Sequence, residues 1–161
     1  MTTAAGPREG EAAPEFDLPT DGEGRVSSAA LRGRPFVLYF YPRDDTPGCT
    51  QEAMDFAAAY EDFRAAGVEI VGVSKDSVAS HDRFKIKCAL PFPLASDESS
   101  GVVEGYGAWV EKNMYGKKSM GTERCTFLVD GGGRVRRVWR QVKVPGHVGE
   151  VLQAARQLGG A

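Results

Sequence analysis

Cysteine and histidine are both scarce in this chain. Three cysteines, Cys49, Cys88 and Cys125, stand far apart among 161 residues. Their odd number and wide spacing do not fit the paired disulfide framework of a small secreted domain. The two histidines, His81 and His147, lie far from each other and from any cysteine pattern. We therefore expect no metal site and no other cofactor site.

Long hydrophobic runs and an excess of one charge sign are also absent. No run is long enough to span a bilayer, and the first sixteen residues include no apolar segment of signal-peptide length. The formal net charge is −2, so neither nucleic acid nor an acidic membrane is an expected partner. The arginines between Arg134 and Arg140 fit an exposed edge strand better than a nucleic-acid site. Together with the cysteine usage, these features favour a reducing cytoplasm.

The distribution of apolar residues predicts one α/β domain over residues 1–161. Strand-like runs alternate with stretches of helical spacing, and the first thirteen residues are expected to be a loose arm. A hairpin with its turn at residues 21–24 should precede the first buried strand. Further strands are predicted at 36–41, 68–74, 92–94, 125–130 and 134–140, helices at 49–66, 77–88, 99–106 and 148–158, and a long loop at 107–121.

The stretch around Cys49 is the most informative part of the chain. A buried strand is predicted over Phe36–Tyr41, Pro42 ends it, and Thr46 followed by a proline is typical of a helix start. Cys49 then lies in the first helical turn, where free N–H groups and the helix dipole favour an anion. Cys49 could instead be a small buried core residue, but its loop is polar and its neighbours are small. A reactive thiol is the favoured interpretation.

The pattern Pro42-x-x-x-Thr46-x-x-Cys49 resembles the active-site motif of the peroxiredoxins. The longer segment FYPRDDTPGCTQEA is similar to their Q-type, bacterioferritin-comigratory branch, and the resemblance runs from about residue 14 to residue 158. It implies a thioredoxin-like fold, with a central mixed sheet flanked by helices and an N-terminal β-hairpin extension. Further matches follow in order at Gly72–Asp76, Phe92–Leu94, Tyr106–Trp109, Tyr115–Lys117 and Arg124–Leu128.

The resemblance implies a thiol-dependent peroxidase that reduces hydrogen peroxide and small organic hydroperoxides. Cys49 is the implied peroxidatic residue and becomes a sulfenic acid. Thr46 would place its hydroxyl beside the sulfur, although a helix cap is its simpler role. Arg124 would keep the thiolate charged, whereas without the resemblance it is a surface charge. Pro42 would shield the site from water, and Glu52 could hold Arg124 by an ion pair.

The thiol that reduces the sulfenic acid is left open by the sequence. Many Q-type members carry a resolving cysteine five residues after the first, where this chain has Met54. Cys88, near the end of a predicted helix, and an external thiol, for example that of thioredoxin, are the two candidates. Cys125 adjoins Arg124 on a predicted strand, so it should face the other way and pack in the core.

A disulfide oxidoreductase and a redox-sensing protein are the two alternative functions. A disulfide oxidoreductase needs a Cys-x-x-Cys motif, and no second cysteine follows Cys49 at that spacing. A redox-sensing or chaperone-like protein could use Cys49 oxidation as a signal, and only sustained turnover with a thiol separates it from the enzyme. We expect a monomer or a weak homodimer.

Overall fold

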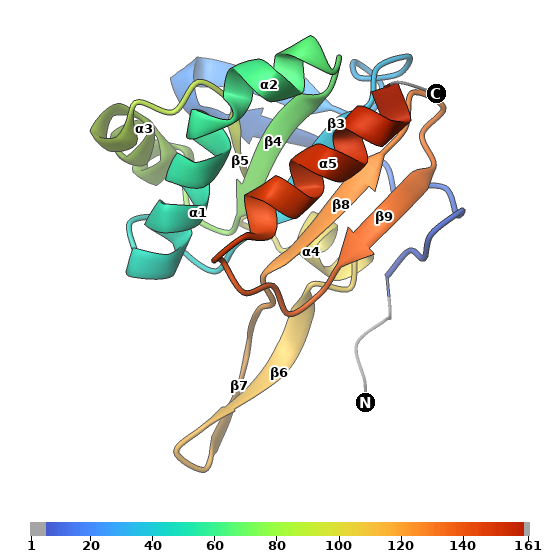
Figure 1. Ribbon diagram of the computed structural model, residues 1–161. Helices are drawn as coiled ribbons and strands as arrows, with labels where there is room; N and C mark the ends of the chain where they lie inside the picture. Colours follow the sequence, from blue (N-terminus) through green and yellow to red (C-terminus); the bar gives the residue numbers. More distant parts are fainter. Residues whose placement is uncertain (1–5, 160–161) are drawn as a thin grey trace.

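A seven-stranded sheet runs through the molecule in the computed structural model, which describes residues 6–159 (Figure 1). Its spatial order is β2-β1-β5-β4-β3-β8-β9. The pairs β3–β4 and β4–β5 are parallel and the others antiparallel, so the expectation of a mixed sheet is confirmed. The strands are β1 (Asp17–Thr20), β2 (Gly24–Ser27), β3 (Phe36–Phe40), β4 (Glu69–Ser74), β5 (Leu94–Ser96), β8 (Cys125–Val129) and β9 (Val135–Trp139).

The strand β3 lies in the middle of the sheet, and all five of its residues are buried. It consists of aromatic, β-branched and aliphatic residues, which suit a strand covered on both faces. Val37 and Tyr39 pack into the apolar cluster on one face, while Leu38 and Phe40 pack into the cluster on the other. The carboxyl end of this rigid strand therefore fixes where the loop to the next helix begins.

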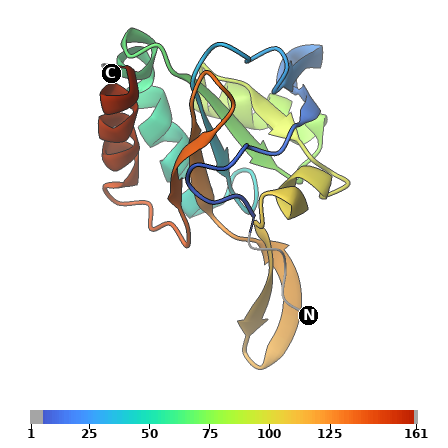
Figure 2. The same ribbon diagram turned by 90° about the vertical axis from the view of Figure 1, so that its right-hand side faces the viewer.

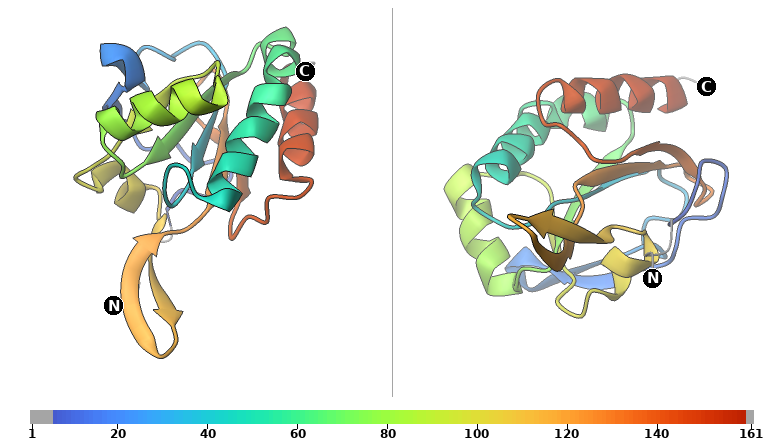
Figure 3. Two further views of the ribbon diagram at one scale, coloured as in Figure 1. Left: turned by 90° about the vertical axis from the view of Figure 1, so that its left-hand side faces the viewer. Right: turned by 90° about the horizontal axis from the view of Figure 1, so that it is seen from below.

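Four helices contribute to the cluster that includes Tyr39. Figures 1 and 3 show α1, α2 and α5 covering one face of the sheet, with α3 beside β5. The helix expected over 49–66 is divided at Ala59, so α1 and α2 follow one another. The short α4 (Gly101–Gly105) and the N-terminal hairpin contribute to the opposite face. The four helices are α1 (Pro47–Ala58), α2 (Tyr60–Ala65), α3 (Val78–Cys88) and α5 (His147–Gly159).

The segment 107–121, expected to be a loop, forms a hairpin that projects from the body of the molecule (Figures 2 and 3). Its strands, β6 (Trp109–Met114) and β7 (Lys117–Thr122), pair only with each other among the described residues. The two turn residues, Tyr115 and Gly116, have φ values of +55° and +79°. Positive φ at both positions is typical of the tight turns that match the twist of paired strands.

The N-terminal arm also departs from the expectation. Residues 1–5 lie outside the described part of the chain, but residues 10–13 are not loose. Gly10 N donates to Val135 O at 2.7 Å, Val135 N donates to Glu11 O at 2.8 Å, and Ala13 N donates to Gly133 O at 2.8 Å. The arm thus pairs with the beginning of the edge strand β9 through backbone groups, which every sequence offers.

Within residues 6–159, no helix has both the length and the apolar character needed to cross a membrane.

Candidate active site

The loop between β3 and α1 places Thr46 at the start of the helix. Thr46 has extended backbone angles, and Thr50 N donates to Thr46 O at 2.8 Å to close the first turn. The Thr46 hydroxyl does not cap the helix; it donates to Arg43 O at 2.9 Å. Pro47 occupies the first helical position, where its missing N–H costs nothing. Pro42, two residues after the end of β3, is half-buried.

Cys49 is the third residue of α1, and its side chain is only 2% exposed. It belongs to the apolar cluster that includes Tyr39. Nη2 of Arg124 donates to the sulfur at 3.4 Å. A Cβ atom at Gly48 would lie 3.1 Å from the same nitrogen, so glycine at this position leaves room for the guanidinium. The sequence-predicted pair, Cys49 and Arg124, is therefore brought together.

Arg124 bridges two groups on one side of α1. Its Nη1 donates to Oε1 of Glu52 at 2.7 Å while Nη2 contacts the sulfur. Cys49 and Glu52 are three residues apart on the helix, so they share a face. Burial lowers the pKa of Arg124, but the negative charges of Glu52 and Cys49 outweigh it and hold that pKa above its usual range. The ion pair expected between Glu52 and Arg124 is present.

Glu52 is the most perturbed acid of the site. Burial raises the pKa of Glu52 to about 7, partly offset by the charge and hydrogen bond of Arg124. Its second oxygen, Oε2, is buried without a hydrogen-bond partner among the described residues, and the same holds for the Tyr39 hydroxyl. Burial, followed by the charge of Glu52, raises the pKa of Tyr39. The sequence predicts Tyr39 only as a strand residue, because nothing in its spacing connects it to Glu52.

The other two thiols differ in accessibility. Cys88 is the last residue of α3, is half-buried, and packs against the same cluster as Cys49. Burial raises the pKa of Cys88. Cys125 is fully buried in the cluster on the opposite face of the sheet, and burial raises its pKa to about 12. Cys125 therefore faces away from Cys49, as the strand alternation predicted.

Residues 6–159 include no group of three His, Cys, Asp or Glu side chains arranged to hold a metal ion. The chemistry of the site is that of one sulfur, one guanidinium, one carboxyl group and one hydroxyl. A sulfur held by a guanidinium at a helix start suits nucleophilic attack on a polar substrate.

Comparison with known proteins identifies similar chains. The AhpC/TSA family model matches residues 10–138. A Coxiella burnetii protein named putative peroxiredoxin bcp is 51% identical over 143 residues, which cover 89% of this chain and 95% of that protein.

Solved structures are similar along nearly the whole chain. The Xanthomonas campestris bacterioferritin comigratory protein, described for its alkyl peroxide reduction activity, superposes with a TM-score of 0.86 at 44% identity, covering 89% of this chain and 92% of that one. A mutant of Xylella fastidiosa PrxQ superposes with a TM-score of 0.91 at 35% identity, covering 96% of this chain and 98% of that one.

Proposed function

The chain belongs to the AhpC/TSA family, in its Bcp or peroxiredoxin Q branch of thiol-dependent peroxidases, and on this basis we propose that Cys49 is the sulfur that attacks the peroxide. Its fold is thioredoxin-like. The observation that supports the proposal most directly is the 3.4 Å contact from Arg124 Nη2 to Cys49 Sγ. A guanidinium beside the sulfur stabilises the thiolate, which is the nucleophilic form.

The proposed reaction breaks the O–O bond and forms an S–O bond. The Cys49 thiolate attacks one peroxide oxygen, the other leaves as hydroxide or alkoxide and takes a proton, and the product is a sulfenic acid plus water or an alcohol. Arg124 donates to the oxygens as negative charge moves onto the leaving group. Because the Thr46 hydroxyl donates its proton to Arg43 O, its oxygen lone pairs can accept a hydrogen bond from the peroxide. Pro42 limits access of water.

The proposed substrates are hydrogen peroxide and small organic hydroperoxides. The alkyl peroxide reduction described for the Xanthomonas campestris relative supports the second class. The apolar cluster to which Cys49 belongs is compatible with an alkyl group near the sulfur.

A thiol must then reduce the sulfenic acid, and two routes are proposed. Cys88 can form a disulfide with Cys49 if the end of α3 rearranges, since a disulfide needs Cα atoms within about 7 Å. Alternatively, an external thiol such as that of thioredoxin reacts directly. Continued cycling needs a thiol-reducing compartment, so we place the enzyme in the cytoplasm.

Serine substitutions at the three cysteines test the proposal, with Cys125→Ser as the matched control. We expect Cys49→Ser to abolish peroxide consumption while a thiol donor is present, and Cys125→Ser to keep it. Turnover like that of the wild type in Cys49→Ser excludes Cys49 as the peroxidatic residue. A single stoichiometric oxidation of the wild type, without turnover, supports a redox sensor instead.

The intact mass of peroxide-treated protein distinguishes the two routes of reduction. A loss of about two mass units in the wild type that disappears in Cys88→Ser assigns Cys88 as the resolving thiol. The addition of one oxygen in both proteins assigns the external route.

A further inference from the structure

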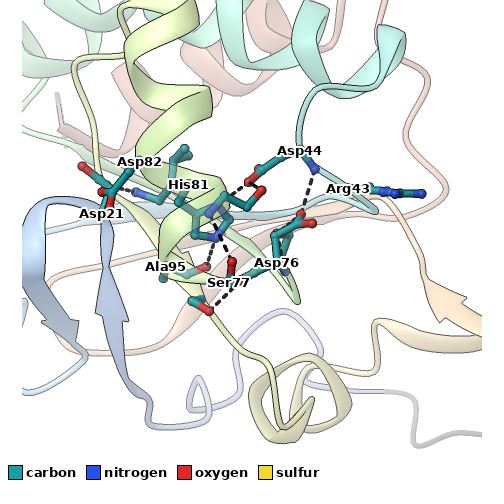
Figure 4. Close-up of polar contacts among 12 residues, drawn as sticks. Asp21, Arg43, Asp44, Asp76, Ser77, His81, Asp82 and Ala95 are labelled. Atoms are coloured by element: carbon teal, nitrogen blue, oxygen red, sulfur yellow. Dashed lines mark hydrogen bonds and ion pairs between the residues drawn. The ribbon is translucent and has the colours of Figure 1, made fainter.

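His81 is completely buried in α3 and contacts two oxygen acceptors (Figure 4). Its Nδ1 lies 2.7 Å from Oδ2 of Asp44, and its Nε2 lies 3.0 Å from the carbonyl oxygen of Ala95. A neutral imidazole has only one N–H, so one ring nitrogen would direct a lone pair at an oxygen. When Asp44 is ionised, both contacts are favourable together only if both nitrogens donate, that is, if His81 is an imidazolium.

The carboxylate that faces His81 is itself built to stay ionised. Besides His81, the Asp44 oxygens accept from the Tyr41 hydroxyl at 2.6 Å and from the Ser80 hydroxyl at 2.7 Å. Burial raises the pKa of Asp44, but the hydrogen bonds from His81 and Tyr41 outweigh burial and hold it below its usual range. A buried ion pair of this kind is retained when the remaining donors and acceptors are satisfied, as they are here.

Other charged groups surround the pair from the neighbouring elements. Asp76, in the turn before α3, accepts from Asp44 N at 2.8 Å and from the Ser74 hydroxyl at 2.6 Å. Further along α3, Asp82 accepts from Gly22 N at 2.8 Å and Lys85 pairs with Asp21 at 2.9 Å. His81 is thus the cationic partner of the Asp44 carboxylate. Asp76 is a second carboxyl group, which contacts the backbone of Asp44.

A short chain of contacts leads from this pair to the active site. Asp44 is held at its backbone by Asp76 and at its side chain by His81. Arg43, the preceding residue, lies beside Asp44 in Figure 4, and its carbonyl oxygen accepts from the Thr46 hydroxyl at 2.9 Å. The direction of that hydroxyl is therefore set by the conformation of the loop that Asp44 anchors.

We propose that His81, as a buried imidazolium, is a positioning residue for peroxide reduction: it fixes Asp44 and, through the Arg43 carbonyl, the Thr46 hydroxyl at Cys49. The inference rests on the roles proposed above for Cys49 and Thr46. It adds a residue from a different element, 37 positions away from Asp44 in sequence. It predicts that removal of the His81 ring loosens the loop and slows attack on peroxide.

The protonation state can be measured directly, since the chain has only two histidines. In histidine-labelled protein at pH 7, NMR should show one ring with both nitrogens protonated, and this signal should vanish in His81→Gln. His147 is an internal reference, because burial lowers its pKa to about 4 and keeps it neutral. Two neutral rings at pH 7 overturn the proposal without any variant having to fold.

Kinetics test the positioning role. We expect His81→Gln to lower kcat/KM for hydrogen peroxide by about tenfold. The matched control is Asp82→Asn on the same helix, where the amide oxygen can still accept from Gly22 N, and it should keep the wild-type kcat/KM. A folded His81→Gln protein with wild-type kcat/KM contradicts the proposal.

A double-mutant cycle tests the route through Thr46. Thr46→Val removes the hydroxyl, so His81→Gln should add little further loss of kcat/KM in that background. If the double variant instead loses kcat/KM by the product of the two single-variant factors, the route through Thr46 is refuted. The Cys49→Ser experiment is independent of these outcomes, since it tests the nucleophile and leaves the His81 contacts in place.

Discussion

At the scale of single residues, the guanidinium of Arg124 contacts two partners at once. It donates to Glu52 at 2.7 Å and to the Cys49 sulfur at 3.4 Å, from two different nitrogens. The planar fork of arginine serves both partners in a fixed geometry, whereas the ammonium group of lysine is a single point charge. The shorter contact holds the side chain, and the longer one leaves room for the guanidinium to turn toward a peroxide.

Arg124→Lys should therefore lower kcat/KM for hydrogen peroxide by roughly 10²-fold, in the range seen when one charge-stabilising donor is removed. Because lysine retains the positive charge, the loss of kcat/KM measures the contribution of the guanidinium geometry. Arg43→Lys, at an exposed side chain in the neighbouring loop, is the control and should have a small effect. A rate for Arg124→Lys within a factor of two of wild type would refute the two-partner role.

The raised pKa of Glu52 predicts that the free energy of unfolding depends on pH. Burial raises its pKa from 4.5 to about 7 in the folded protein, so the native state binds more protons than the unfolded chain between these values. The contribution of Glu52 to the free energy of unfolding must then fall as pH rises from about 4.5 to about 7. At about 1.4 kcal/mol per pH unit, the upper bound is on the order of 3 kcal/mol.

The measurement is denaturant unfolding of the wild type and Glu52→Gln across this pH range. Glutamine does not titrate, so the variant should lose the decline. Glu61→Gln, at an exposed position of α2, should keep it. Parallel curves for wild type and Glu52→Gln disprove a raised pKa at Glu52.

The sequence predicts some of these residues better than others, for physical reasons. The positions of Thr46 and Cys49 can be predicted from nearby sequence alone, because one strand end and one helix start place both. Arg124 comes from 75 residues away, and only the family resemblance pointed to it. The contact between Asp44 and His81 was not predicted at all, since no short-range pattern determines which loop a buried histidine meets.

At the scale of elements, the apolar pattern of the sequence predicts buried strands better than exposed ones. The buried strands β3, β4 and β8 were predicted within a residue or two, because their apolar runs have no alternative reading. The hairpin β6–β7 was missed, because exposed strands that pair only with each other have no apolar face. The division of the helix at Ala59 was also missed, since helical spacing continues across it.

The end of α3 makes a prediction of its own. Ala89, which ends the helix, has φ +52° and ψ +49°, a left-handed conformation that costs a residue with a Cβ about 1 kcal/mol. Ala89→Gly should therefore raise the melting temperature of the reduced protein by about 2–4 °C. Ala79→Gly, at an exposed position within the same helix, is the matched control and should lower it by a similar amount.

The same pair of variants bears on Cys88. If Cys88 reaches Cys49 by unwinding of the end of α3, Ala89→Gly should slow disulfide formation after peroxide treatment, whereas Ala79→Gly, near the other end of the helix, should change it little. Thermal scans and quenched-mass time courses measure the two effects separately. A lower melting temperature in Ala89→Gly contradicts the assigned strain at Ala89.

At the scale of the whole molecule, the edges of the sheet and the projecting hairpin bear on self-association. One edge, β2, is only four residues long, and the other, β9, is partly paired by residues 10–13. Short or covered edges oppose pairing between copies. The tip of the hairpin instead presents Tyr115, which is fully exposed. A single exposed aromatic residue provides little of the area that a stable interface buries.

We therefore expect the 17.3 kDa chain to sediment as a monomer at micromolar concentration, with at most weak dimerisation at higher concentration. Any dimer that depends on the hairpin should weaken in Tyr115→Ser, because the ring is the large apolar side chain at the tip. Sedimentation velocity over a hundredfold range of concentration measures both. A dimer that persists at the lowest concentration contradicts the expectation and requires an interface on a larger face of the molecule.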